Sequence, residues 1–201
     1  MKKGEKRKQE LIKIAYRMFT EKGYENTSID EIIAEAGIAK GTYYYYFESK
    51  EATLEAVIDM MIEEEVGRAK EVLAASMTVP RKLVSVIYAL RPAQNEQVIA
   101  KALDANENIV MHQKANRRIV EEAVPLLAEV VREGISQGIF NCTNTEERVK
   151  MLIILSQHMF DDGVFTDRDV EVYVDIVEKA LGAENGTMSF IAELISGGQN
   201  E

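Results

Sequence analysis

The residues best suited to binding chemistry lie in one short stretch from Lys40 to Phe47, which contains four consecutive tyrosines. Tyrosine hydroxyls donate and accept hydrogen bonds, and the rings pack against flat or apolar groups. Gly41 adds a position without a side chain, where another molecule can approach the backbone closely. Lysine, threonine and tyrosine are side chains that contact phosphate oxygens and base edges of DNA. The stretch therefore offers a polar, aromatic surface on which another molecule can bind.

If this stretch is helical, the tyrosines divide between two faces, because successive residues turn by about 100°. The face predicted to pack in the core holds Tyr43, Tyr46 and Phe47. The opposite face, predicted to be exposed, holds Gly41, Tyr44 and Tyr45, flanked by Lys40 and Thr42. An aromatic-rich core helix with no DNA contact is the alternative interpretation of the same run.

Other residue patterns favour neither catalysis nor a metal. His158 and Asp162 are four residues apart, a spacing that places two ligands on one helix face, but the sequence indicates no third ligand. The chain has no phosphate-binding glycine loop, dinucleotide-binding fingerprint, HExxH or CxxC motif. We therefore predict no catalytic residues, no metal and no cofactor.

A second group of soft or aromatic side chains could line a pocket for an apolar small molecule. These residues are Tyr88, Met111, His112, Met159, Phe160 and Phe165. At helical spacing such residues are more often part of the core, so both interpretations stand.

The elements that must position the tyrosine stretch are two preceding helices. Apolar residues recur at helical spacing over 8–22, and Gly23 supplies a stop. Ser28 and Glu31 have the spacing of a capping box, which predicts the start of a second helix. Gly37 can adopt a positive φ and so permits the sharp turn of a helix-turn-helix before a third helix over 39–47.

The whole composition favours an all-α fold, with 46% apolar residues, three prolines and no tryptophan. We expect a DNA-binding domain over 1–48 and a larger helical domain over 49–201. Helices are expected at about 145–160 and 167–181, and Pro125 should end or kink a helix.

The net charge of −10 is unevenly distributed. Residues 1–55 carry ten basic and ten acidic side chains, whereas residues 56–201 carry 14 basic and 24 acidic ones. The neutral front part can therefore approach a phosphate backbone while the acidic part lies elsewhere. No apolar run is long enough to cross a bilayer, there is no secretory leader and the only cysteine is Cys142, so we expect a cytoplasmic protein without a membrane partner.

The segment from Gly23 to Ser28, followed by GIAKGTYYYYFESKEAT, closely resembles the signature of the TetR family of bacterial transcriptional regulators, of the TetR/AcrR type. The match covers about residues 8 to 55. The resemblance implies that the third helix enters the major groove of DNA. Carried over residue by residue, the implied DNA contacts are Thr27, Ser28, Lys40, Gly41, Thr42, Tyr44, Tyr45 and Lys50.

The same resemblance implies a regulator, most simply a repressor, that binds a pseudo-palindromic double-stranded operator as a homodimer. The dimer would form through the helices near 145–160 and 167–181, with faces that include Val149, Tyr173, Ile176 and Val177. A small-molecule effector, unidentified from sequence, would release the DNA. The alternative is an all-helical small-molecule-binding protein or enzyme on the same fold without sequence-specific DNA binding.

Overall fold

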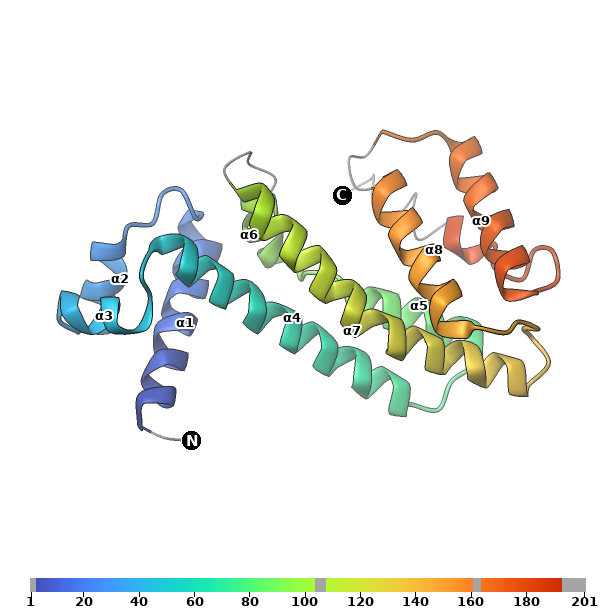
Figure 1. Cartoon of the computed structure of the whole chain (residues 1–201), viewed down its shortest axis with the longest axis horizontal. Coiled ribbons are helices and arrows are strands. Elements are labelled where there is room, and N and C mark those ends of the chain that lie inside the picture. Colours follow the sequence, from blue (N-terminus) through green and yellow to red (C-terminus); the bar gives the residue numbers. More distant parts are fainter. Residues whose placement is uncertain (1–2, 104–107, 161–163, 193–201) are drawn as a thin grey trace. The chain divides into compact units, whose positions relative to one another are not determined.

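The structure, a computed structural model, describes residues 3–103, 108–160 and 164–192, and all regular elements in these ranges are helices (Figure 1). The predicted all-α class is confirmed. In chain order the elements are α1 (Lys3–Lys22), α2 (Ile29–Ala36), α3 (Lys40–Tyr46), α4 (Lys50–Ala74), α5 (Val79–Ala89), η1 (Gln94–Glu96), α6 (Gln97–Leu103), α7 (Ile109–Ser136), α8 (Thr145–Phe160) and α9 (Asp167–Leu181). None of these helices is long and apolar enough to span a membrane.

The chain forms two compact units. Unit 1 comprises residues 1–65 and 91–117, and unit 2 comprises residues 66–90 and 118–201. Helices α4 and α7 therefore each contribute residues to both units.

The core of unit 1 forms because α1 presents apolar side chains every three or four residues. The fully buried members of this core include Leu11, Ala15, Phe19, Ile32, Tyr43 and Leu54, which come from four different helices. Helix α1 packs against α2, and α2 packs against α3. The core thus fixes the three helices that carry the predicted DNA contacts.

Both ends of α2 form as the sequence predicts. Ser28 accepts a hydrogen bond from the backbone N–H of Glu31, and the Glu31 carboxylate accepts one from the backbone N–H of Ser28. At the other end Gly37 adopts φ 60° and ψ 40°, the left-handed conformation that a glycine reaches without strain. Helix α3 begins three residues later, so the predicted helix-turn-helix is confirmed.

Residues 91–117 belong to unit 1 because a buried carboxylate attaches η1 to α1. Glu96 is 2% exposed, and its Oε1 accepts a hydrogen bond from the Tyr16 hydroxyl at 3.0 Å. Its Oε2 accepts the backbone N–H of Ala93 at 2.7 Å. Both carboxylate oxygens therefore have donors, as a buried acid requires.

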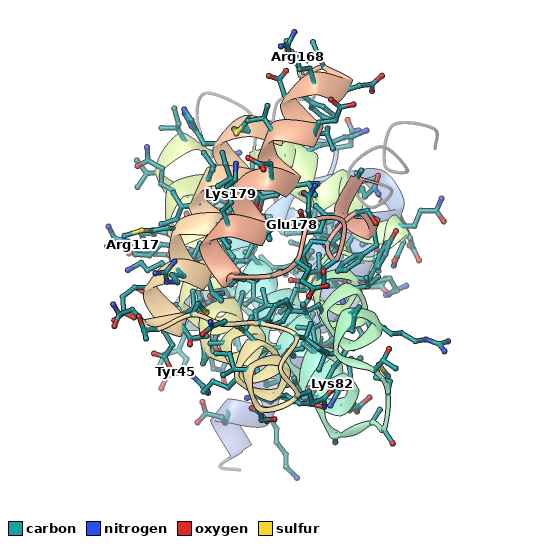
Figure 2. The ribbon with its side chains drawn as sticks, turned by 90° about the vertical axis from the view of Figure 1, so that its right-hand side faces the viewer. Tyr45, Lys82, Arg117, Arg168, Glu178 and Lys179 are labelled. Carbon is teal, nitrogen blue, oxygen red and sulfur yellow. The ribbon has the colours of Figure 1, made fainter. Side chains whose placement is uncertain are left out.

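In unit 2, polar contacts join α5 to the distant α7 and join α9 to the segment that follows it. Lys82 of α5 forms an ion pair with Glu133 of α7 at 2.7 Å. Glu178 of α9, labelled with Lys82 in Figure 2, is 4% exposed and accepts the backbone N–H of Met188 at 2.8 Å. These contacts fix α9 to the segment that follows it and α5 to α7.

No helix ends at Pro125. Helix α7 runs from Ile109 to Ser136 with Pro125 inside it, so the predicted ending at this residue is wrong. The buried side chains Leu126, Leu127, Val130 and Val131 continue the apolar face beyond the proline. Burial of this face offsets the hydrogen bond that proline cannot donate.

The close approach of Gly182 to the loop before α8 generates a stability prediction. Gly182 has φ +64°, and a Cβ atom there would lie 2.1 Å from the carbonyl oxygen of Asn141. We expect Gly182→Ala to lower the free energy of unfolding by at least about 3 kcal/mol, because backbone atoms must move. Urea-induced unfolding measures the loss.

The matched control is Gly138→Ala in the same unit, where φ is +72° but no atom lies within 4 Å of the added Cβ. This variant has only the conformational cost, about 1 kcal/mol. Equal losses in the two variants would show that the contact with Asn141 contributes nothing.

Candidate nucleic-acid interface

Helix α3 separates its tyrosines as the helical spacing predicts. Tyr43 is fully buried, whereas Tyr44 is 45% and Tyr45 is 80% exposed. Phe47 is buried at the end of the helix, and Tyr46 is half-buried. The predicted division of the run into a core face and an exposed face is confirmed for Tyr43, Phe47, Tyr44 and Tyr45.

Burial of Tyr43 is compatible with its polar hydroxyl because α4 supplies a partner. The Tyr43 hydroxyl hydrogen-bonds the hydroxyl of Thr53, which is itself fully buried and donates to the carbonyl of Ser49. Burial raises the pKa of Tyr43, so the ring stays neutral. The contact fixes the rotation of α3 about its axis and therefore the direction of Tyr44 and Tyr45.

We use the name α3 outer face for Lys40, Gly41, Thr42, Tyr44 and Tyr45. Lys40, Gly41, Tyr44 and Tyr45 are exposed, and Thr42 is partly exposed. At Gly41 nothing lies within 4 Å of an added Cβ, so another molecule can approach the backbone there. The structure therefore brings five of the eight predicted contacts to one exposed surface.

The charge of Lys40 is partly balanced within the protein. Its Nζ lies 3.2 Å from Oδ1 of Asp30, and both side chains are exposed. Such a pair is weak in water, so the ammonium can exchange Asp30 for a phosphate. Sequence reasoning missed Asp30, because ten residues separate it from Lys40.

The start of α2 carries Ser28, whose polar atoms are occupied by the capping box. The Ser28 hydroxyl lies 2.9 Å from the Glu31 carboxylate, which also accepts from Lys22 at 2.9 Å. The hydrogen bonds from Lys22 and Ser28 lower the pKa of Glu31 to about 2. Ser28 is exposed; its hydroxyl donates to Glu31 and accepts the Glu31 N–H, which leaves one acceptor lone pair beside the helix end.

Thr27 differs from the other predicted contacts. Its side chain is 1% exposed, and its hydroxyl donates to the carbonyl of Gly23 at 2.9 Å. Its backbone N–H donates to the carbonyl of Tyr24 at 3.1 Å. Thr27 therefore caps the end of α1 in this structure, and neither donor is available to a phosphate.

Lys50, the first residue of α4, extends to the connection between α1 and α2. Its Nζ lies 4.2 Å from the centre of the Tyr24 ring and 3.4 Å from the carbonyl oxygen of Glu25. The side chain is partly exposed. The ammonium of Lys50 thus lies at the connection formed by residues 24–28, whose last residue is Ser28.

Acidic residues border the α3 outer face on its α4 side. A hollow of about 400 Å³ there is lined by Lys8, residues 44–48, Ala52, Glu55, Ala56 and Asp59. Lys8 Nζ lies 5.6 Å from the centre of the Phe47 ring, and Glu55 forms an ion pair with Lys114. The carboxylates of Glu48, Glu55 and Asp59 disfavour a phosphate at this point, so they limit how far a DNA backbone can extend.

Two family profiles match this chain. The profile described as "Bacterial regulatory proteins, tetR family" matches residues 11–57, and "Tetracyclin repressor-like, C-terminal domain" matches residues 91–182. The chain belongs to the TetR family. Regulators of this family bind operator DNA as dimers and respond to small-molecule effectors. The chain is therefore a helix-turn-helix transcriptional regulator.

Several relatives agree with this assignment. The chain is 28% identical over 142 residues to the fatty acid metabolism regulator protein of Bacillus subtilis, covering 69% of this chain and 73% of the relative. It is 26% identical over 167 residues to the HTH-type transcriptional repressor KstR2 of Mycolicibacterium smegmatis, covering 83% of this chain and 71% of the relative. Both relatives are named as regulators.

Solved structures share the fold. A transcriptional regulator from Cytophaga hutchinsonii aligns with a TM-score of 0.65 at 20% identity, covering 93% of this chain and 95% of that one. A TetR transcription regulator from Haloarcula marismortui aligns with a TM-score of 0.63 at 21% identity, covering 95% and 98%. The N-terminal helix-turn-helix and the C-terminal helices of this TetR-family chain thus follow a known architecture.

The predicted effector-binding residues of this TetR-family chain fall in both units. Met111 and His112 are partly exposed in unit 1. In unit 2, Met159 and Phe165 are partly exposed, and Tyr88 is 52% exposed. The side chain of Phe160 lies outside the described residues, as does Asp162, the proposed partner of His158. The described residues contain no group of three or more metal-ligating side chains.

Helices α8 and α9 have the bounds that the sequence predicts, but their exposed faces differ from the predicted ones. Val149, Tyr173 and Val177 are buried within unit 2, and the Tyr173 hydroxyl donates to the carbonyl of Leu152 at 3.1 Å. The apolar side chains that remain exposed are Met151 and Ile154 on α8, and Val172 and Ile176 on α9. Only Ile176 was on the predicted interface face.

The capping box generates a prediction for the acid stability of the regulator. Because the pKa of Glu31 is lowered from 4.5 to about 2, its contribution is complete above pH 4.5 and disappears as the pH falls to about 2. We expect Glu31→Gln to have a lower melting temperature than the wild type at neutral pH, with the difference vanishing near pH 2. Circular dichroism melts across this range measure the effect.

Glu21→Gln, an exposed substitution on α1, is the control and should give a curve parallel to that of the wild type. If the melting temperatures of Glu31→Gln and the wild type differed by the same amount at every pH, the ionised Glu31 carboxylate would not be what stabilises the cap.

Proposed function

We propose that this regulator is a repressor that binds a pseudo-palindromic operator as a homodimer and is released by a small-molecule effector. The observation that carries the proposal is the exposure of Tyr44 and Tyr45 beside the buried Tyr43, on the helix that follows the Gly37 turn. Two adjacent exposed tyrosines supply rings and hydroxyls that, in a major groove, would contact base edges and phosphates.

The proposed DNA contacts are Ser28, Lys40, Gly41, Thr42, Tyr44, Tyr45 and Lys50. Thr27 is omitted because its side chain is buried and both of its donors are bonded. The α3 outer face would lie against base edges, and Lys50 with the Ser28 end of α2 would contact the backbone. In this assignment residues 1–48, together with Lys50 just beyond them, bind DNA, and the rest of 49–201 supplies the effector-binding and dimerisation functions.

The dimer is proposed to form through α8 and α9. Each helix keeps a pair of exposed apolar side chains, spaced three residues apart on α8 and four apart on α9, so each pair lies on one side of its helix. Burial of such faces between two copies gives a symmetric four-helix contact. The dimer then presents two copies of α3, which matches a pseudo-palindromic site.

The effector is proposed to be an apolar small molecule. Support comes from the flexible or aromatic side chains Met159 and Phe165 of unit 2 and from the name of one relative, a fatty acid metabolism regulator. Binding rather than catalysis is the proposed activity, because the family and the named relatives are regulators. An effector would lower the affinity of the regulator for its operator.

The first test concerns the α3 outer face. We expect Tyr45→Ala to weaken binding to a duplex from the upstream region of its own gene by about 10-fold to 100-fold, because a base or phosphate contact is lost. Fluorescence anisotropy measures the affinity, and the melting temperature should stay unchanged because Tyr45 is 80% exposed.

Tyr88→Ala is the matched control, since Tyr88 is also an exposed tyrosine but belongs to unit 2. It should leave operator affinity in the absence of effector within about 2-fold of the wild type. Unchanged specific binding in Tyr45→Ala, Tyr44→Ala and Lys50→Ala would refute these residue roles.

The second test concerns dimerisation. We expect the double substitution Met151→Glu and Ile176→Glu to convert the dimer to a monomer, because carboxylates would be buried in an apolar interface. Sedimentation velocity measures the mass. Val164→Glu, which adds a charge at an 81% exposed position outside α8 and α9, should leave the mass unchanged. A double variant that stays dimeric would place the interface elsewhere.

A further inference from the structure

Tyr24 occupies an unusual place for a core residue, because it contacts both the core and a lysine proposed to bind DNA. It lies in the connection between α1 and α2 and is 5% exposed. On the core side its ring packs edge-on against Phe19, with 5.2 Å between ring centres. The Lys50 Nζ lies 4.2 Å from the centre of the same ring. This distance is well within the range of a cation–π interaction.

We propose that Tyr24 is a positioning residue for operator binding, whose ring holds the Lys50 ammonium at the connection between α1 and α2, ready to contact the DNA backbone. The inference rests on the proposed function, because it requires that Lys50 contacts a phosphate.

A ring at this position matters because a lysine side chain is long and flexible. Without a partner, the ammonium at the start of α4 would sample many positions, and fixing it on DNA would cost conformational entropy. The Tyr24 ring and the Glu25 carbonyl oxygen, 3.4 Å from Nζ, together restrict the ammonium before DNA arrives. Lysine has three N–H donors, so these two contacts leave capacity for a phosphate oxygen.

The hydroxyl of Tyr24 adds a second interaction with the same turn. It lies near the carboxylate of Glu51, the residue after Lys50, and burial together with the nearby carboxylates of Glu51 and Glu25 raises the pKa of the hydroxyl. One tyrosine thus interacts with two consecutive residues of α4, the ammonium through its face and the carboxylate through its hydroxyl. A residue that served only as core packing would need neither interaction.

The position of Lys50 also explains how α4 and the N-terminal end of α2 can contact the same part of the DNA backbone. Lys50 belongs to α4, but the Tyr24 ring places its ammonium beside the 24–28 connection, which ends at the exposed Ser28. A single backbone phosphate can then meet a cation from α4 and the N-terminal end of α2. The ring therefore converts two separate contacts into one site.

The closing experiment compares three variants of the full chain on the operator duplex, with the affinity measured at salt concentrations from about 50 to 200 mM. Tyr24→Leu removes the ring, Tyr24→Phe keeps the ring without the hydroxyl, and Lys50→Met removes the cation. Each phosphate contact contributes about 0.9 to the slope of log affinity against log salt. We expect Tyr24→Leu and Lys50→Met each to lower the slope by about one per subunit, and Tyr24→Phe to retain it.

The double variant Tyr24→Leu with Lys50→Met should bind no more weakly than Lys50→Met alone, because the ring acts through the lysine. Two outcomes would show that Tyr24 only packs in the core. In the first, Tyr24→Leu binds DNA more weakly but keeps the wild-type slope of log affinity against log salt. In the second, the losses of binding free energy in the two single variants add up in the double variant. An unchanged slope in Lys50→Met would overturn the inference together with the role of Lys50.

A second readout needs no DNA and so separates the inference from the proposed function. In wild-type protein labelled with ¹³C-lysine, the ring current of Tyr24 should shift the Lys50 ε-CH₂ signal upfield, with Lys50→Arg identifying the signal by its disappearance. Tyr24→Phe should keep the shift. A Lys50 ε-CH₂ signal at the chemical shift of the other lysines would overturn the inference even if operator binding is normal. A shifted signal without specific DNA binding would refute the proposed function alone.

Discussion

The arrangement of the proposed DNA-binding surface depends on the burial of one side chain, Tyr43. A buried tyrosine requires a partner for its hydroxyl, and Thr53 of α4 provides it. Because residues along a helix turn by about 100°, fixing Tyr43 against α4 forces Tyr44 and Tyr45 into solvent. The exposed tyrosines are thus a consequence of a contact between α3 and α4. A change at Thr53 would alter the α3 outer face without touching any residue on it.

Pairing of charges explains how a small neutral domain can favour specific over general DNA binding. Lys40 pairs with Asp30, Lys22 with Glu31, and Arg17 with Glu35. Paired cations attract a distant polyanion weakly, so little affinity for arbitrary DNA comes from net charge. In the proposed complex, affinity would then depend on hydrogen bonds and ring contacts that form only when α3 fits the groove. The acidic residues beside the hollow reinforce this selectivity.

Features that depend on residues close in sequence could be predicted, and those that depend on distant residues could not. The Ser28 cap, the Gly37 turn and the bounds of α8 and α9 follow from local spacing. The inward orientation of Thr27 depends on the Gly23 carbonyl at the end of α1, a geometry that spacing does not give. Likewise, periodicity shows that α8 and α9 each have an apolar face but not which apolar residues pack within unit 2. Val149 and Tyr173 do so, while Met151 and Ile154 stay exposed.

The hydrogen bond between Tyr16 and Glu96 attaches the segment 91–117 directly to α1. Both oxygens of the Glu96 carboxylate are used inside the protein, one by Tyr16 and one by the backbone N–H of Ala93. Because the carboxylate is buried, a displacement of η1 relative to α1 would leave its Oε1 without the Tyr16 donor, although the Ala93 N–H would still bind Oε2, and an unsatisfied buried acceptor costs about 1–3 kcal/mol. Helix α1 must therefore move with η1 or lose this contact. Since α1 packs against α2, and α2 against α3, a continuous series of packed helices connects η1 with the exposed tyrosines.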